Sequence, residues 1–96
     1  MVYQNGLNKY YILEMYNKRT WLNKEDSPST GNVVAYDGYY EHDGKKYRNL
    51  FLSVSDCYNA ARLHKTEDDT VDDFILKMKT LRDNIDEFIE YLEKNK

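Results

Sequence analysis

The chain has 96 residues, of which 41% are hydrophobic and 32% are charged, and its formal net charge is −3. This length suits one domain with one modest core, and the composition is that of a globular rather than a disordered protein. The basic residues are scattered along the sequence instead of being clustered, so direct nucleic-acid binding is not expected.

The sequence contains no segment suited to a membrane or to export. No stretch approaches the roughly 18 to 20 apolar residues that a spanning helix needs, and residues 1–6 lack a basic region followed by an apolar run. Cys57 is the single cysteine, so it cannot form an internal disulfide. These features predict a cytoplasmic protein that contacts no membrane.

The first elements alternate in a way that is typical of strands. Residues 9–16 predict a strand, and Asn17-Lys18 predicts a turn into a short partner strand that holds Trp21. We expect this only tryptophan to be largely buried. Residues 23–31 contain no apolar side chain and predict a long, flexible loop.

A hairpin is predicted next, with strands at residues 32–41 and 45–53. Asp-Gly pairs at 37–38 and 43–44 compete for its turn, and only four residues separate the pairs, so two long hairpins do not fit. We place the turn at 43–44 and interpret Gly38 as a bulge or bend.

Two helices are predicted after the hairpin. Residues 54–65 predict a short helix, with a serine N-cap and inward residues at helical spacing. Residues 70–94 predict a long amphipathic helix, in which Thr70 and Asp73 form a capping box. The apolar stripe of the long helix comprises Val71, Phe74, Ile75, Met78, Leu81, Ile85, Phe88, Ile89 and Leu92.

These elements predict an α+β fold with a small antiparallel, three- or four-stranded, Tyr-rich sheet. The short helix and the long C-terminal helix pack with the sheet. Residues 1–96 then form a single domain, of which residues 1–53 are mainly strands.

Ten tyrosines are more than a sheet of this size needs for its core. Sheet packing explains some of them, because tyrosine favours strands. Tyrosine is also enriched at binding hot spots, so the sequence predicts an exposed contact surface. Its candidate residues are Tyr10, Tyr36, Tyr39, Tyr40 and Tyr47.

The helical part of the sequence offers two further surfaces. Residues 56–96 carry seven Lys/Arg against eleven Asp/Glu, and this acidic side is either a solvated face or a surface for a basic partner. The partner-binding candidates there are Asp72, Asp73, Asp86 and Glu87. The stripe also keeps a heptad pattern, which predicts a homodimer contact at its far end, through Ile85, Phe88, Ile89 and Leu92.

No pattern in the sequence predicts catalysis. Two histidines and one cysteine give no metal-ligand spacing, and no glycine-rich phosphate loop is present. We therefore predict no enzyme, no catalytic or metal-binding residues and no cofactor.

The expected function is that of a non-enzymatic binding or inhibitor protein with a host protein as partner. The chain is similar to small bacteriophage or mobile-element proteins that block a host factor. The similarity lies in its size, its charge, its tyrosine content and a residue usage typical of AT-rich genomes, and it implies an anti-defence role. One alternative is a protein that binds or sequesters a small, nucleotide-like ligand against stacked tyrosines. Another is a helix-paired dimeric regulator.

Overall fold

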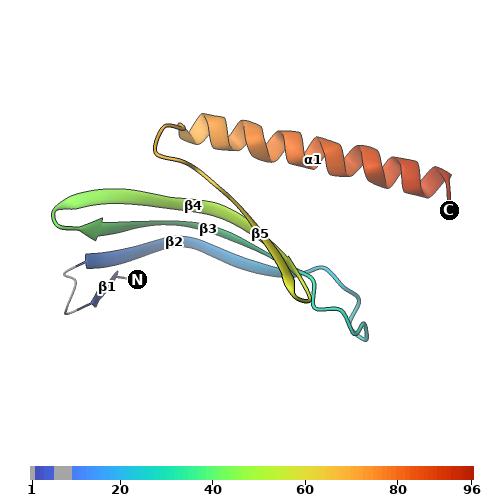
Figure 1. The fold of residues 1–96 in the computed structure, drawn as a ribbon, viewed down its shortest axis with the longest axis horizontal. Helices are drawn as coiled ribbons and strands as arrows, with labels where there is room; N and C mark the ends of the chain where they lie inside the picture. The colour runs from blue at the N-terminus through green and yellow to red at the C-terminus, as the bar shows by residue number, and fades with distance from the viewer. Residues whose placement is uncertain (1, 6–9) are drawn as a thin grey trace. The chain divides into compact units, whose positions relative to one another are not determined.

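The computed structural model describes residues 2–5 and 10–96, with side chains from residue 12 onward. The chain divides into two units, Met1–His64 and Lys65–Lys96. The first unit is a β-sheet and the second contains the helix (Figure 1). The α+β class is therefore confirmed, while the single domain stays a prediction.

Five antiparallel strands form the sheet, in the order in which they occur along the chain. Each strand pairs with its neighbour in sequence, so the sheet is a meander that exceeds the three or four strands predicted. The strands are β1 (Val2–Asn5), β2 (Tyr10–Trp21), β3 (Asn32–His42), β4 (Lys45–Asp56) and β5 (Asn59–His64).

The β3–β4 hairpin turns at the predicted Asp-Gly pair. Asp43 has φ 51° and Gly44 has φ 82°. Positive φ at both central residues is the geometry of a type I′ turn, whose twist matches that of the flanking strands. This turn fixes the register that places Tyr40 opposite Tyr47.

The predicted turn at Asn17-Lys18 is wrong, because β2 continues to Trp21. The strand instead contains a bulge, where the pairing with β3 shifts between Glu14 and Tyr16. The bulge or bend expected at Gly38 on β3 is therefore a bulge in the neighbouring strand β2. Because the bulge adds one residue, Tyr16 points to the face opposite that of Glu14.

The short helix predicted over residues 54–65 is also wrong. β4 continues to Asp56 and β5 occupies Asn59–His64. Between them, Cys57 has φ 53°, which turns the chain instead of starting a helix. Ala60 and Ala61 have little intrinsic preference for a strand, so the hydrogen-bonded pairing with β4 outweighs local propensity here.

Strand alternation and register give the sheet two different faces. One face, which we call the aliphatic face, contains Leu13, Val33, Ala35, Leu50, Leu52, Val54 and Leu63. The other, the aromatic face, contains Ile12, Glu14, Asn17, Arg19, Trp21, Tyr36, Tyr40, Tyr47, Asn49, Phe51 and Arg62.

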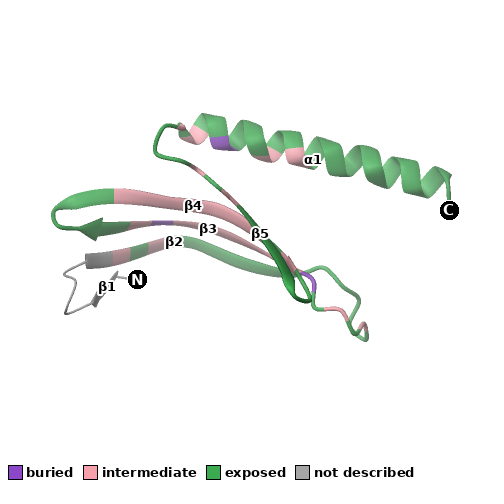
Figure 2. Ribbon diagram, viewed as in Figure 1, coloured by how far each residue is buried: buried purple, intermediate pink, exposed green. Residues whose placement is uncertain are grey.

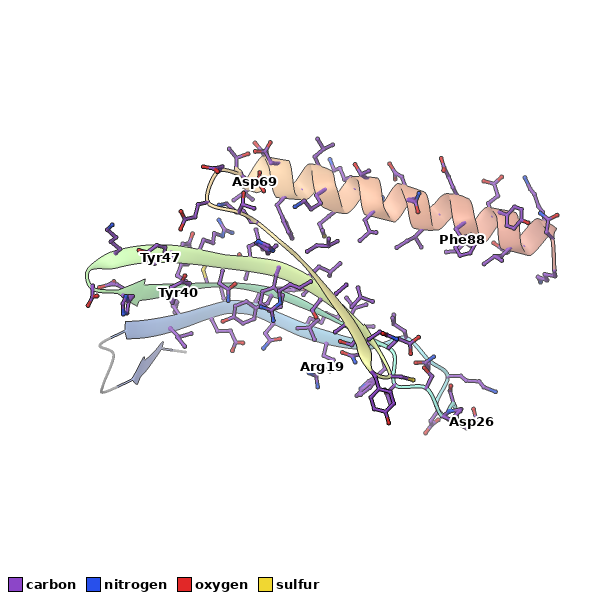
Figure 3. All side chains as sticks on the ribbon, in the orientation of Figure 1. Arg19, Asp26, Tyr40, Tyr47, Asp69 and Phe88 are labelled. Carbon is purple, nitrogen blue, oxygen red and sulfur yellow. The ribbon has the colours of Figure 1, made fainter. Side chains whose placement is uncertain are left out.

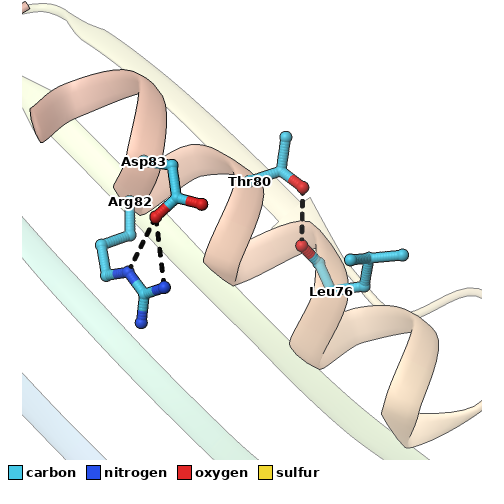
Figure 4. A network of polar contacts seen from close by, with 4 residues as sticks. All are labelled: Leu76, Thr80, Arg82 and Asp83. Carbon is cyan, nitrogen blue, oxygen red and sulfur yellow. Dashed lines mark hydrogen bonds and ion pairs between the residues drawn. The ribbon is translucent and has the colours of Figure 1, made fainter. Parts of the chain in front are cut away.

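The long helix α1 (Val71–Lys94) confirms the prediction for residues 70–94. The Thr70 side chain accepts from the Asp73 backbone and Asp73 accepts from the Thr70 backbone, which completes the capping box. Along the helix, the Thr80 hydroxyl donates to the Leu76 carbonyl at 2.9 Å (Figure 4).

Full burial is rare among the described residues (Figure 2). Of the hydrophobic residues whose side chains the structure describes, Phe74 alone is buried, with 7% of its surface exposed. Trp21 is 63% exposed, so the expectation that it is buried is wrong. No helix in the described part of the chain is long and apolar enough to cross a membrane.

Candidate partner-binding surface

Two stacked pairs of rings lie across β3 and β4 on the aromatic face. Tyr40 and Tyr47 have ring centroids 5.0 Å apart (Figure 3). Tyr36 and Phe51 have centroids 5.1 Å apart. Both pairs are direct partners in the strand register, and stacking of this kind contributes about 0.5–1.5 kcal/mol beyond area burial. The rings are therefore held in place before any partner arrives.

Arg62 extends one of these pairs onto β5. Its guanidinium carbon lies 3.9 Å from the centroid of the Phe51 ring, which is a close cation–π contact. Tyr36, Phe51 and Arg62 thus form a continuous row across three strands.

Gly38 lies on β3 between the two aromatic pairs. A Cβ atom there would lie 2.8 Å from the Leu13 carbonyl oxygen and 2.9 Å from the Tyr36 hydroxyl. Only glycine fits without a shift of the backbone. The Tyr36 ring therefore lies over Gly38. A recess of about 120 Å³ is lined by Ile12, Tyr36, Tyr39, Tyr40 and Asn49.

Polar side chains flank Gly38 on the two neighbouring strands. Glu14 pairs with Gly38 across β2 and β3, and Asn49 pairs with it on the other side. One oxygen of Glu14 accepts a 2.6 Å hydrogen bond from the Asn17 amide. The pKa of Tyr36 is raised, mainly by burial and further by the charges of Glu14 and Asp37.

Tyr39 belongs to the opposite face of the sheet. The Lys46 amine lies 4.6 Å from its ring centroid and the Arg48 guanidinium 5.5 Å. Arg48 also donates two hydrogen bonds to Asp37, at 3.0 and 2.8 Å, and this side-chain hydrogen bonding raises the pKa of Arg48. A polar cluster therefore occupies the hairpin end of the aliphatic face.

The predicted tyrosine surface is thus divided between two faces. Tyr36, Tyr40 and Tyr47 lie together, and Tyr39 lies behind them. The side chain of Tyr10 is outside the described residues. Sequence reasoning did not include Phe51, Asn49 or Arg62. Phe51 and Asn49 could have been found from the Asp-Gly turn. A turn at residues 43–44 fixes the strand register, which pairs residue 36 with 51 and residue 38 with 49.

The structure places the acidic candidates on one side of α1. Asp72 and Asp86 are fourteen residues apart, as are Asp73 and Glu87, so each pair repeats after two heptads. All four are exposed, and Asp73 is also part of the helix cap. Their role in binding stays a prediction.

The dimer candidates are four large exposed side chains in the second half of α1. Ile85 is 48% exposed, Phe88 60%, Ile89 46% and Leu92 47%. Apolar groups at this spacing form a continuous stripe, which water solvates poorly.

The polar loop after β2 has internal hydrogen bonds. The Leu22 backbone donates to the Gly31 carbonyl at 2.9 Å, and Asn23 accepts from the Gly31 backbone. The Ser29 hydroxyl donates to Asp56 at the end of β4. The flexibility expected for residues 23–31 stays a prediction, although these bonds close the loop at its base.

Comparisons were made with protein families, with curated proteins and with solved structures, and none of them finds a match to this chain. No group of three or more His, Cys, Asp or Glu in the described residues is arranged to hold a metal ion. A functional proposal must therefore start from the surfaces themselves.

Proposed function

We propose that this chain is a non-enzymatic binding protein whose exposed apolar surfaces contact another protein. One observation supports the proposal above all. Among the described residues, fifteen large hydrophobic side chains are exposed and only Phe74 is buried. Large contiguous apolar patches mark contact sites in soluble proteins, and the exposed Ile85, Phe88, Ile89 and Leu92 lie next to one another at helical spacing on α1.

The aromatic face is the best candidate for the main contact. Tyrosine and arginine are enriched at binding hot spots, and the face presents both kinds of side chain in a fixed arrangement. Tyr40 is 40% exposed although it stacks on Tyr47. Rings that are already ordered lose little conformational entropy on binding, which favours affinity.

Affinity capture with matched variants tests this proposal. The double change Tyr40→Ser and Tyr47→Ser removes one stacked pair from the aromatic face. The control pair, Tyr16→Ser and Tyr58→Ser, removes two exposed tyrosines outside the aromatic face, one on β2 and one in the turn between β4 and β5. We expect the wild type and the control to enrich the same protein, and the Tyr40/Tyr47 variant to lose it.

The proposed contact is wrong if the folded Tyr40/Tyr47 variant captures the same protein as the wild type. Circular dichroism shows whether each variant keeps its sheet. The expectations of a bacteriophage source and of a host defence protein as partner stay predictions.

A second candidate function is a helix-paired dimeric regulator. The exposed stripe formed by Ile85, Phe88, Ile89 and Leu92 favours it. A small ligand held against the stacked tyrosines is less well supported, because the recess of about 120 Å³ lined by Tyr36 and Tyr40 is well below the roughly 300–1,000 Å³ of typical ligand pockets. A hollow of about 490 Å³, which is within that range, lies at the polar loop instead, lined by Trp21, Asn23, Lys24, Glu25, Ser27, Ser29 and Thr30.

A further inference from the structure

We propose that the uncovered backbone edge of β4 at residues 45–50 is the place where an extended, acidic segment of the partner protein adds to the sheet as a further strand. The inference rests on the proposed function for the existence of a partner. It adds the part of the sheet that the partner contacts and the charge of the segment that makes the contact.

The strand β4 is longer than the strand that covers it. It has 12 residues and β5 has 6. Only residues 51–56 of β4 pair with β5, whereas residues 45–50 pair with β3 alone. After His64 the chain leaves the sheet and turns, and the Asp69 N–H donates to the Thr66 carbonyl at 3.3 Å. In the described part of the chain, no strand therefore pairs with residues 45–50 on the side away from β3 (Figure 1). We call this side the open edge.

The two turns that flank β4 show which backbone groups lie on the open edge. In a two-residue hairpin, the residues on either side of the turn exchange hydrogen bonds, and the direction of bonding then alternates along the strand. Lys45 therefore bonds to β3, and residues 46, 48 and 50 direct their N–H and C=O groups away from it. The β4–β5 turn gives the same alternation, because Asp56 bonds to β5. The open edge thus presents the donors and acceptors that an added strand requires.

The long cationic side chains beside the open edge point back over β3. The Lys46 amine lies 4.6 Å from the centroid of the Tyr39 ring. Arg48 donates two hydrogen bonds to Asp37. Both contacted residues belong to β3. Lysine often protects a sheet edge by keeping other strands away. Here these contacts draw the side chains toward the interior of the sheet, so the protection of the edge is weakened.

The charge at the open edge favours an acidic segment over a second copy of the chain. Lys45 and Lys46 form no ion pair among the described residues. Antiparallel pairing of two copies, centred on the open edge, would place the Arg48 residues of the two chains opposite each other. Like charges opposite each other destabilise a strand pair. Carboxylates on an incoming strand would instead be attracted by the two unpaired lysines.

Tyr47 gives an incoming strand a hydrophobic contact on the aromatic face. The row formed by Tyr36, Phe51 and Arg62 crosses three strands, because β5 supplies Arg62. The second stacked pair, Tyr40 and Tyr47, ends on β4 beside the open edge. An added strand would place a side chain next to Tyr47, and aromatic or β-branched residues stabilise such cross-strand pairs. The open edge is therefore continuous with the ring surface of the proposed contact.

Hydrogen exchange measured by nuclear magnetic resonance on the full chain tests the open edge with a peptide in place of the partner. The probe is a capped hexapeptide that alternates glutamate and valine, and its counterpart alternates lysine and valine. We expect the acidic peptide to slow exchange at the amides of residues 46, 48 and 50. It should also bind about two- to fivefold more tightly than the lysine peptide, as for an exposed ion pair.

Two matched proline variants test whether the backbone makes the contact. Lys46→Pro removes one N–H from the open edge and keeps the bonds to β3, and proline is tolerated on edge strands. Ala60→Pro makes the same change on the outer edge of β5. We expect Lys46→Pro to abolish peptide binding and Ala60→Pro to retain it. Lys45→Gln with Lys46→Gln leaves every N–H in place, should remove the preference for the acidic peptide, and guards against a misfolded proline variant.

Three results would overturn the inference. The acidic peptide could leave exchange at residues 46, 48 and 50 unchanged, or the lysine peptide could bind as tightly. The same amides could also become protected without peptide as the protein concentration rises, which would assign the open edge to a second copy. Affinity capture separates this inference from the proposed function. Failure of the wild type to capture any protein, with peptide binding intact, would reject the proposed function alone. Capture by Lys46→Pro equal to that by the wild type would reject only the open edge.

Discussion

At the scale of single residues, the Asp37–Arg48 pair is the least exposed ion pair among the described residues. The two side chains are only 21% and 27% exposed, so water solvates both charges poorly. Each charge therefore depends on the other for compensation. We expect Asp37→Ala to lower the free energy of unfolding by about 1–3 kcal/mol, because Arg48 keeps its charge without its partner. Urea unfolding measures this loss.

An exposed ion pair provides the control for that measurement. Lys24 and Asp26 lie 3.6 Å apart and are both about four-fifths exposed, and Asp26→Ala should leave the unfolding midpoint unchanged. Equal losses from the two aspartate changes would contradict the importance given to burial.

Tyr36 is the residue that should make stability depend on alkaline pH. Burial and the nearby carboxylates raise its pKa above the ordinary 10.0. An unfolded tyrosine therefore ionises first, and the stability that Tyr36 contributes is present below pH 10.0 and lost as pH rises through its higher folded value. We expect Tyr36→Phe to reduce the alkaline fall in the urea midpoint. The same change at exposed Tyr91 should leave that fall in place.

At the scale of elements, the β4–β5 turn contains a residue in a strained backbone conformation. Cys57 has φ 53°, a conformation that costs a residue with a Cβ about 1–2 kcal/mol. Cys57→Gly should therefore raise the free energy of unfolding by about 1 kcal/mol. Tyr58→Gly, one residue later and without positive φ, should not. A less stable Cys57→Gly variant would show that the thiol makes a contact more valuable than the strain.

The same turn explains which elements the sequence could predict. The Asp43-Gly44 turn and the helix over residues 70–94 follow local rules, namely positive φ at Asp-Gly and a capped apolar stripe, so both were predictable. β5 follows no local rule, because its alanines form a strand only through their pairing with β4. Cysteine is not a residue that favours positive φ, so the conformation of Cys57 could not be predicted from the sequence.

The candidate site was predictable only in part, for a related reason. The excess of tyrosine indicated an exposed ring surface, and three of the five named tyrosines do share a face. The role of Gly38 depends on both neighbouring strands, which bring Glu14 and Asn49 beside it. Those pairings depend on a bulge in β2 that the sequence does not mark.

At the scale of the whole molecule, self-association through α1 is the sharpest prediction. We expect sedimentation equilibrium to show a dimer, because burying an exposed side chain such as Phe88 or Leu92 contributes about 1.5–3 kcal/mol. Phe88→Asp with Leu92→Asp should give a folded monomer. Leu76→Asp, also at an exposed position but outside the stripe, should remain dimeric. A wild-type monomer at high micromolar concentration would exclude this contact.

The order of the strands has a consequence for how the chain folds. Every strand pairs with its neighbour in sequence, and two of the connections, 43–44 and 57–58, are only two residues long. Closing such short loops costs little chain entropy, so the sheet has a low contact order for a β structure and should form quickly. During synthesis, the last sheet residue, His64, leaves the ribosome before any of α1 does. The sheet can therefore form hairpin by hairpin while the helix is still being synthesised.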